Sequence, residues 1–328
     1  MFDGKKVLIT GGTGSLGQAL TNRLLETDVE TIRIFSREEF KQVKMQSEIN
    51  DKRLRFLIGD IRDKERLWRA LEDIDIVIHA AALKHVPVAE YNPFEAVKTN
   101  VYGSQNLIEA CLDREVKTVL AVGTDKAVSP LNTYGATKLL MERLFIAANN
   151  YKGKHITKFL CVRYGNVLGS RGSIVPNIID KIKNEKPIQI TDTSMTRFNI
   201  TMNQALDLIF RALTKNVGGE ILVPKLKAYR LGDLVEAMTE LLDTKPEIEK
   251  IPVRQGEKYH EMLINKHEIR NVFETKDDYI IFEKQCNSKE SDRMFSDKTS
   301  LKDEYSSDKV KLLSKQELKD ILNQEQII

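Results

Sequence analysis

The sequence feature that most constrains the fold is a glycine-rich run that directly follows a short apolar segment near the start of the chain. Residues 6–10 read KVLIT, which suits a β-strand buried on both faces of a parallel sheet. Glycines at positions 11, 14 and 17 permit a tight turn, close approach to a pyrophosphate and close packing of the next helix. We therefore predict a βαβ unit that binds a dinucleotide through the backbone and side chains of Gly11, Gly12, Thr13, Gly14, Ser15, Leu16 and Gly17.

Short apolar runs and helical periodicities then alternate through the first half of the chain. Asn92 and Pro93 mark the start of one helix, as its N-cap and first helical residue, and this helix is expected to run to about Asp113. Further strands are expected at 31–35, 54–58, 75–79, 118–122 and 159–164. The alternation predicts an α/β fold with a doubly wound parallel sheet of the Rossmann type.

The pattern loosens after Gly165 into shorter elements, which we interpret as a smaller C-terminal substrate lobe. A chain of 328 residues is longer than one compact domain usually is, which agrees with two parts that share a cleft. Helices are expected at 203–213 and 231–242, with a strand at 221–223 between them, and a short terminal helix is expected from Ser314, as its cap, to about Leu322. The expected parts are a nucleotide-binding domain at 1–165, an interleaved lobe at 166–285 with segments around 196–218 returning to the first domain, and a charged tail at 286–328. The Ser/Asp/Lys/Glu-rich stretch 287–309 reads as a linker or a solvated surface wrap.

Composition excludes several classes of protein. Lys and Arg number 51 against 48 Asp and Glu, and a net charge of +3 is too balanced for a protein that binds nucleic acid through its bulk charge. No run approaches the roughly 18 apolar residues that cross a bilayer, so membrane insertion and secretion are not expected. Cys111, Cys161 and Cys286 have no metal-binding spacing, and we expect no metal site and a cytoplasmic location.

The end of the second expected strand bears on the choice between NAD and NADP. Ser36, Arg37 and Lys41 favour a 2′-phosphate and therefore NADP, whereas Glu38 and Glu39 keep a solvated charged turn open as the alternative. After the third strand, Asp60 and Ile61 occupy the position where an adenine ring would lie. After the fourth strand come Ala80, Ala81 and Ala82, whose side chains are small enough to let a cofactor pass close by.

Two groups of polar residues near the fifth strand point to catalysis. Tyr134 and Lys138 are four residues apart and therefore share one face of a helix, where the lysine would lower the pKa of the phenol so that it accepts a proton from a sugar hydroxyl. Thr124, Asp125 and Lys126 lie at the tip of the strand. Thr124 suits hydrogen bonding, and the Asp–Lys pair supplies an acid and a base for a further step, such as proton removal next to a ketone and loss of a hydroxyl. A surface ion pair is the alternative interpretation of Asp125 and Lys126.

Together these motifs resemble the inverting UDP-N-acetylglucosamine 4,6-dehydratases, which are polysaccharide biosynthesis proteins of the extended short-chain dehydrogenase/reductase family. Retaining 4,6-dehydratases carry an Asp–Glu pair where this chain has Asp125 and Lys126. The stretches that carry the resemblance are 9–17 (ITGGTGSLG), 35–41 (FSREEFK), 80–91 (AAALKHVPVAEY), 124–138 (TDKAVSPLNTYGATK), 163–172 (RYGNVLGSRG), 195–198 (MTRF) and 254–257 (RQGE).

The resemblance implies a role for each matching residue. Tyr134 takes the 4-hydroxyl proton while hydride passes from C4 to a tightly bound NADP, Lys126 removes the C5 proton and Asp125 assists departure of the 6-hydroxyl. Hydride then returns to C6, and C5 is reprotonated on the opposite face. Val167 begins a segment on the nicotinamide side. The implied substrate contacts are Lys84, Asn166, Arg171, Thr191, Arg197, Arg254 and Glu257, with an ion pair between the lobes as the alternative for Arg197.

The leading hypothesis is therefore a lyase that acts on UDP-N-acetylglucosamine and recycles NADP. Three alternatives remain: a UDP-sugar 4-epimerase, which has no use for Lys126; a retaining 4,6-dehydratase; and a nonenzymatic NADP-binding regulator, in which the Tyr–Lys pair is usually lost. The resemblance also implies a homo-oligomer, a dimer or higher, built through the helices expected at 92–113 and 134–149.

Overall fold

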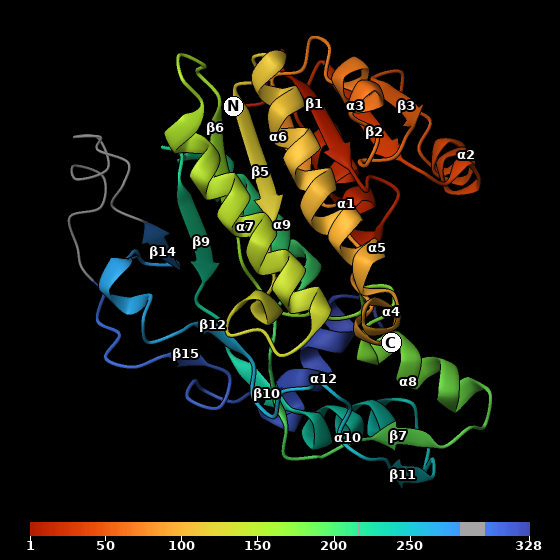
Figure 1. Cartoon of the computed structure of the whole chain (residues 1–328). Helices are drawn as coiled ribbons and strands as arrows, with labels where there is room; N and C mark the ends of the chain where they lie inside the picture. The colour runs from red at the N-terminus through yellow and green to blue at the C-terminus, as the bar shows by residue number, and fades with distance from the viewer. Residues whose placement is uncertain (216, 283–298) are drawn as a thin grey trace.

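Parallel pairing of the N-terminal strands builds the sheet that the sequence predicts. The computed structural model describes residues 1–215, 217–282 and 299–328, in which a large α/β part lies above a smaller lobe (Figure 1). The strands of the main sheet are β1 (Lys6–Thr10), β2 (Thr31–Ser36), β3 (Leu54–Ile58), β4 (Ile76–His79), β5 (Thr118–Val122), β6 (Lys158–Val162), β9 (Glu220–Pro224), β13 (Val272–Glu274) and β14 (Asp278–Phe282). Within the described residues their order is β13-β14-β9-β6-β5-β4-β1-β2-β3. The neighbours from β9 to β3 pair in parallel, whereas β14 pairs antiparallel with both of its neighbours, β9 and β13.

Helices cover both faces of this sheet (Figure 1). They are α1 (Ser15–Leu25), α2 (Glu39–Glu48), α3 (Lys64–Ala70), α4 (Val86–Tyr91), α5 (Pro93–Val97), α6 (Gly103–Asp113), α7 (Thr133–Tyr151) and α9 (Met202–Thr214). Successive residues of β1 point to opposite faces: Leu8 joins the apolar cluster under α3, α6 and α7, whereas Val7 and Ile9 join the cluster under α1 and α9. A strand buried on both faces explains the unbroken apolar run seen in the sequence.

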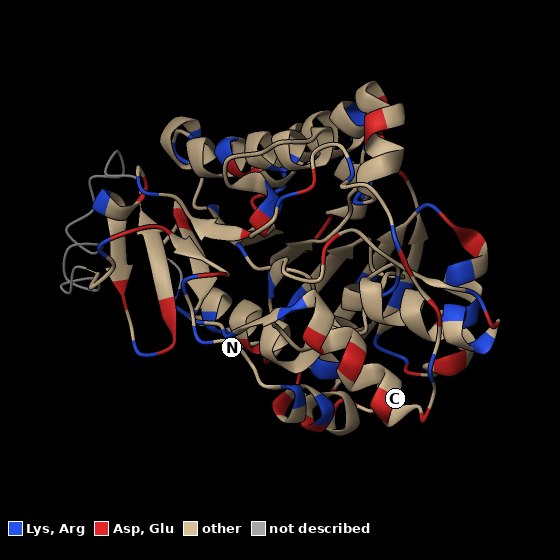
Figure 2. Ribbon diagram, turned by 90° about the horizontal axis from the view of Figure 1, so that it is seen from below, with Lys and Arg blue, Asp and Glu red and all other residues tan. Residues whose placement is uncertain are grey.

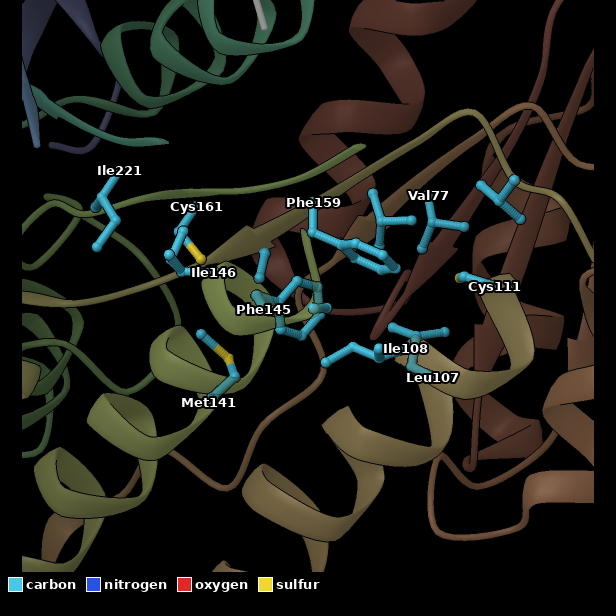
Figure 3. Close-up of a cluster of buried hydrophobic side chains, with 14 of the residues drawn as sticks. Val77, Leu107, Ile108, Cys111, Met141, Phe145, Ile146, Phe159, Cys161 and Ile221 are labelled. Carbon is cyan, nitrogen blue, oxygen red and sulfur yellow. The ribbon is translucent and has the colours of Figure 1, made fainter. Parts of the chain in front are cut away.

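The apolar cluster under α6 and α7 fixes the helix that carries the expected catalytic tyrosine (Figure 3). Phe145 of α7 packs edge-on against Phe159 of β6, with ring centroids 6.0 Å apart. Cys111 and Cys161 are fully buried in the same cluster, as small core residues. Because α7 is packed along its length, its first turn has a fixed position at the carboxyl edge of the sheet.

The smaller lobe has its own apolar core, to which the helices α8, α10 and α12 all contribute. Its elements are α8 (Ile174–Lys183), β7 (Ile188–Ile190), β8 (Thr196–Phe198), β10 (Ala228–Arg230), α10 (Leu231–Leu241), β11 (Ile248–Lys250), β12 (Met262–Ile264), β15 (Tyr305–Ser306) and α12 (Lys315–Gln324). Three two-stranded pairs connect them: β8 with β10, β7 with β11, and β12 with β15.

The range expected for the smaller lobe needs correction. The strand expected at 221–223 exists as β9, but it lies in the main sheet between β6 and β14, and β13 and β14 continue the sheet beyond it. The interleaving therefore reaches further than the expected segment around 196–218. Ile221 pairs with Cys161, and Leu222 pairs with Val162. A three-residue apolar run carries no information about which sheet it joins, because pairing is decided by contacts far along the chain.

The charged tail is also more integrated than expected. Tyr305 and Ser307 are buried, so this part of the expected surface wrap is wrong, and Leu318 and Leu322 of α12 belong to the core of the lobe. Ser314 caps α12, as predicted, and forms a reciprocal capping box with Glu317. Cys286 and residues 287–298 of the expected linker lie outside the described residues.

The helix expected at 92–113 begins at Pro93, as predicted, but it is not regular throughout. Lys98–Tyr102 forms a π-helical stretch between α5 and α6. The Asn92 side chain donates to the carbonyl of Val88 in the preceding turn and does not cap the new helix. Such π-helical insertions often occur at functional sites, and nothing in the apolar periodicity of the sequence marked this one.

Charged residues of both signs are intermixed along the elements of both lobes, as Figure 2 shows. This distribution agrees with the small net charge of +3. Among the residues that the structure describes, every helix is too short or too polar to cross a membrane.

A buried arginine connects the sheet, α7 and the segment that follows β12. Arg163, which is 1% exposed, donates to Glu142 of α7 at 2.8 Å, to Glu268 at 3.1 Å and to the carbonyl of Leu263 at 2.9 Å. The Glu142 side chain is equally buried. One guanidinium therefore compensates the charge of two carboxylates, the fully buried Glu142 and the partly buried Glu268.

Replacing this arginine should destabilise the protein strongly. We expect Arg163→Met to lower the free energy of unfolding by about 3–5 kcal/mol, because it leaves buried carboxylates without a partner. Urea denaturation followed by circular dichroism measures the change. Arg23→Met, which removes a partly exposed ion pair with Asp207, is the matched control and should cost far less; equal losses in the two variants would contradict a special role for Arg163.

Candidate active site

The candidate site is built on a tight turn that follows β5 directly. Asp125–Ala127 forms a 3₁₀ turn, and the Thr124 hydroxyl accepts from the Lys126 N–H at 3.4 Å and donates to Asp125 Oδ1 at 2.9 Å. The turn lies against the start of α7, where Gly135 allows close approach: a Cβ at Gly135 would fall 2.2 Å from the carbonyl oxygen of Lys126. Asn132 caps α7 by accepting from the Gly135 N–H.

Lys126 is the centre of a network of charged and polar groups that reaches from the buried Asp125 and Glu261 to the exposed Asn166. Its Nζ donates to Asp125 Oδ1 at 3.1 Å and to Asn166 Oδ1 at 3.3 Å, and it lies 3.2 Å from Glu261 Oε1. Burial alone would lower the pKa of Lys126, but the two carboxylates outweigh burial and raise it above its ordinary value. Burial raises the pKa of Asp125, with the charge of Glu261 acting in the same direction. The resting site therefore holds an ammonium ion at Lys126, next to a carboxylate that is unusually easy to protonate.

Tyr134 and Lys138 lie near each other on α7, as predicted, but their electrostatics differ from the expectation. Burial raises the pKa of Tyr134 to about 12, and the charge of Lys126 is the main influence that lowers it. Lys138 instead donates to the carbonyl of Val122 at 2.6 Å, and burial lowers its pKa to about 8. The expectation that Lys138 lowers the pKa of Tyr134 is therefore not met in this structure, because the ammonium is directed at the backbone of β5.

The glycine-rich run has the geometry of a phosphate loop. Gly11 has a φ of +68°, and a Cβ there would lie 2.9 Å from the backbone of Ala81, so the loop after β1 touches the loop after β4. No described side chain caps the start of α1, whose N-cap is Gly14. Free N–H groups at the start of a helix are the donors that a pyrophosphate requires. The residues present therefore fit a dinucleotide.

The residues expected at the adenosine end have mixed surroundings. Arg37 is half exposed, with its guanidinium 3.9 Å from Asp60, and is available to a ligand, whereas Lys41 pairs with Glu38. The Ser36 hydroxyl accepts from Gln42 at 3.0 Å. Ile61 is buried against α6 as part of the core, so its side chain does not face a ligand.

The segment that begins at Val167 lies beside the phosphate loop. The Arg171 N–H donates to Ser15 Oγ at 3.2 Å, and Lys84 donates to the Arg171 carbonyl at 2.7 Å. Burial lowers the pKa of Lys84. These contacts bring Ser15, an expected cofactor residue, together with Arg171 and Lys84, which are expected substrate residues.

Three other expected substrate residues form a cluster within the smaller lobe. Arg197 pairs with Glu257 at 3.4 Å and donates to the carbonyls of Thr196 and Tyr259. Among the residues that the structure describes, its ion pair therefore lies inside the lobe and not between the lobes. The Arg254 N–H donates to Glu257 at 3.2 Å. A further expected substrate residue, Thr191, donates to the sulfur of Met195. Among the described residues, no hydrogen bond connects Thr191 with Lys126.

Comparison with known proteins places the chain in a family. A family model described as "Polysaccharide biosynthesis protein" matches residues 7–283. The chain belongs to this family. Its polysaccharide biosynthesis relatives include the inverting UDP-N-acetylglucosamine 4,6-dehydratase of Campylobacter jejuni subsp. jejuni serotype O:23/36, 47% identical over 283 residues, which is 86% of this chain and 84% of that protein.

Two other similarities span almost the whole chain. A UDP-glucose 4-epimerase of Rickettsia conorii is 39% identical over 328 residues, which is 98% of this chain and 96% of that protein. The X-ray structure of Pen from Bacillus thuringiensis is 40% identical, covers 100% of this chain with 99% of its own, and superposes with a TM-score of 0.94. The doubly wound fold with a smaller C-terminal lobe is thus shared with a solved member.

Sequence reasoning missed three residues of this polysaccharide biosynthesis protein that the structure places in or beside the site. Glu261 contacts Lys126, and Lys258 donates to the carbonyl of Val128 at 2.5 Å. Asn100, in the π-helical stretch, donates to Thr137 of α7 at 3.0 Å and bonds both backbone groups of Leu83. Each contact joins segments that are distant in sequence, and no local pattern marks them. The described part of the chain holds no cluster of three or more His, Cys, Asp or Glu suited to a metal ion.

Proposed function

We propose that this protein is an inverting UDP-N-acetylglucosamine 4,6-dehydratase that recycles NADP and forms UDP-2-acetamido-2,6-dideoxy-L-arabino-hexos-4-ulose for surface-glycan or nonulosonic-acid synthesis. The observation that carries the proposal is the contact between the buried Asp125 and the partly exposed Lys126 at the carboxyl end of β5, beside Tyr134. An epimerase needs a tyrosine but has no step for an adjacent acid and base. The 47% identity to an enzyme of this name supports the same assignment.

The cofactor and Tyr134 serve the first step. A nicotinamide dinucleotide held at the glycine loop of residues 11–17 would supply the acceptor for the C4 hydride and later the donor for C6. Tyr134 accepts the proton of the 4-hydroxyl, which requires a phenolate, and the cation of Lys126 and the hydroxyl of Thr124 are the groups of this chain that favour it. The product of this step is a 4-ketone, which acidifies the proton on C5.

Asp125 and Lys126 serve the second step as a coupled pair. A proton moves across the 3.1 Å contact from Lys126 Nζ to Asp125, giving a neutral amine and a carboxylic acid. The amine then takes the C5 proton, whose electron pair forms the C5–C6 double bond, and the acid protonates the 6-hydroxyl, which leaves as water. The pair ends as ammonium and carboxylate, as it began. The raised pKa of Asp125 supports this exchange, because it makes the carboxylate a ready acceptor.

The substrate and the cofactor are proposed to lie along the carboxyl edge of the main sheet, between the glycine loop and the turn that carries Lys126. Asn166, which accepts from Lys126, and Lys84 are proposed to contact the sugar, and Arg254 the diphosphate. The reaction is proposed to take place in the cytoplasm, which agrees with the unpaired thiols of Cys111 and Cys161.

The decisive experiment follows the C5 proton. Wild-type protein incubated with UDP-N-acetylglucosamine in heavy water, without added reductant, should give a 4-keto-6-deoxy product that carries deuterium at C5 and has the L-arabino configuration in NMR spectra. Lys126→Ala should lower kcat by about 10²–10⁴-fold and abolish the exchange, because the base is lost, while nucleotide binding remains. Lys154→Ala, on an exposed loop, is the control.

Each alternative has its own outcome in this experiment. A D-xylo product would show a retaining dehydratase, and a 4-epimer that keeps its 6-hydroxyl would show an epimerase. Binding of NADP without any turnover would show a regulator. An inverted product whose C5 carries no deuterium would contradict the solvent-exchangeable base that we assign to Lys126.

Arg37 should decide the cofactor preference. We expect Arg37→Ala to weaken NADP(H) binding by about 1.5–3 kcal/mol, the scale of a charge-assisted hydrogen bond to a phosphate, and to leave NADH binding almost unchanged. Fluorescence titration of both cofactors measures the difference. Arg69→Ala, an exposed arginine on α3 paired with Glu72, should affect neither cofactor, and equal losses for both cofactors in Arg37→Ala would refute the NADP assignment.

We also propose a homo-oligomer through the helices around α4, α5 and α7. Large apolar side chains stand exposed there, which is unusual for a surface in contact with water: Val88, Tyr91, Phe94, Tyr102 and Leu140 are 50–87% exposed. Light scattering should give at least twice the mass of 37.5 kDa. Phe94→Glu should lower the measured mass, whereas Ile248→Glu, an exposed apolar site in the other lobe, should not; a monomeric wild type would overturn the proposal.

A further inference from the structure

Glu261 is a buried carboxylate that no sequence motif assigned to the site. It directly precedes β12 and is 3% exposed. Its Oε1 lies 3.2 Å from Lys126 Nζ, whereas its Oε2 is buried without a hydrogen-bond partner in the described part of the chain. A half-satisfied buried carboxylate lowers stability, so its presence beside Lys126 calls for a functional explanation.

The backbone of Glu261 is fixed by the segment that carries β15. The Glu261 N–H donates to Ser307 Oγ at 2.9 Å, and the Ser307 N–H donates to the Glu261 carbonyl at 2.8 Å. The Ser307 hydroxyl also lies 2.6 Å from the hydroxyl of Thr196 in β8. The carboxylate therefore approaches Lys126 from a rigid support that is independent of the turn carrying Asp125.

Several charged groups lie around the contact between Glu261 and Lys126. Lys126 faces Asp125 from its own turn, Glu261 from the segment before β12, and Arg197 from β8. Glu261 in turn faces the cations of Lys126, Arg197 and Lys258, which outweigh burial and keep its pKa below the ordinary value. Tyr134 of α7 also lies within the field of Lys126. Glu261 is thus a carboxylate at neutral pH, and its main counter-ion is Lys126.

We propose that Glu261 is a positioning residue that holds Lys126 Nζ in place and stabilises the ammonium that forms when Lys126 takes the C5 proton. This inference rests on the proposed function, in which Lys126 is the base. Asp125 cannot fill this place, because it is the group that exchanges a proton with Lys126 during the step. A second, permanently charged carboxylate keeps the amine basic after Asp125 has become neutral.

The role of Glu261 predicts a specific change in pH dependence. The negative charge of Glu261 raises the pKa of both Asp125 and Lys126, so removing it should lower both values. Because the two groups titrate as a coupled pair, the acidic and the basic limb of the kcat profile should move together to lower pH. A residue that only supports the fold would lower the rate or the stability without moving the limbs.

The test compares wild type with Glu261→Gln, Glu261→Asp and Glu304→Gln. Glu261→Gln should lower kcat about 10–100-fold, leave the KM for UDP-N-acetylglucosamine within about threefold, and move both limbs down by about one pH unit. Glu261→Asp keeps the charge but withdraws it by one methylene group, so its rate and its limbs should lie between those of wild type and Glu261→Gln. Glu304→Gln removes a partly exposed carboxylate of the same C-terminal segment and should behave as wild type.

A second measurement does not depend on turnover. The signal of Lys126 in ¹³C-labelled lysine NMR spectra, assigned by its loss in Lys126→Arg, should titrate at lower pH in Glu261→Gln than in wild type. If wild type forms no dehydrated product but this shift is seen, the proposed function fails while the link between Glu261 and Lys126 stands. If product forms but Glu261→Gln and Glu261→Asp keep the wild-type limbs and the wild-type Lys126 titration, the role of Glu261 is overturned. Should Glu261→Gln fail to fold, the Glu261→Asp profile decides alone.

Discussion

The site depends on one constraint, the parallel alignment of β1, β4, β5 and β6. The strands are paired in register, with Thr10 opposite His79, His79 opposite Ala121, and Ala121 opposite Cys161. Their carboxyl ends therefore reach the same edge of the sheet, and the residues that follow each strand meet there. The glycine loop, the three alanines, the Asp–Lys turn and Asn166 owe their proximity to backbone pairing rather than to any attraction among themselves.

This constraint explains how much could be predicted from the sequence. Buried parallel strands show as apolar runs, and polar or glycine residues at their ends mark the functional edge, so the first six strands, the phosphate loop and the pairs at 125–126 and 134–138 were recognisable. The pattern also predicts β9 as a strand, but its expected place in the smaller lobe is wrong, because β9 belongs to the main sheet. Glu261 and Asn100 carried no local signal, because their roles arise from contacts between distant segments. An apolar periodicity predicts that a segment is buried, but it does not predict which distant segment covers that segment.

Residue type also failed to predict electrostatic behaviour. Lys138, which is buried, and Lys126, which is partly buried, lie at the same edge, yet burial lowers the pKa of Lys138 to about 8, while two carboxylates raise that of Lys126. The difference depends on whether anionic partners lie close enough to offset the loss of hydration. The sequence names the two amines, and only the folded structure assigns one to a backbone carbonyl and the other to a pair of carboxylates.

The hydrogen bonds between Ser307 and Glu261 have a consequence for the order of synthesis. The strands and helices that form the phosphate loop emerge from the ribosome long before residues 305–307, and domains generally fold as their sequence becomes available. A nascent chain can therefore shape its nucleotide pocket while the support of Glu261 is still being translated. Lys126 acquires its second, supported carboxylate only after residues 305–307 have been made, so the electrostatic environment of the base is completed later than the nucleotide pocket.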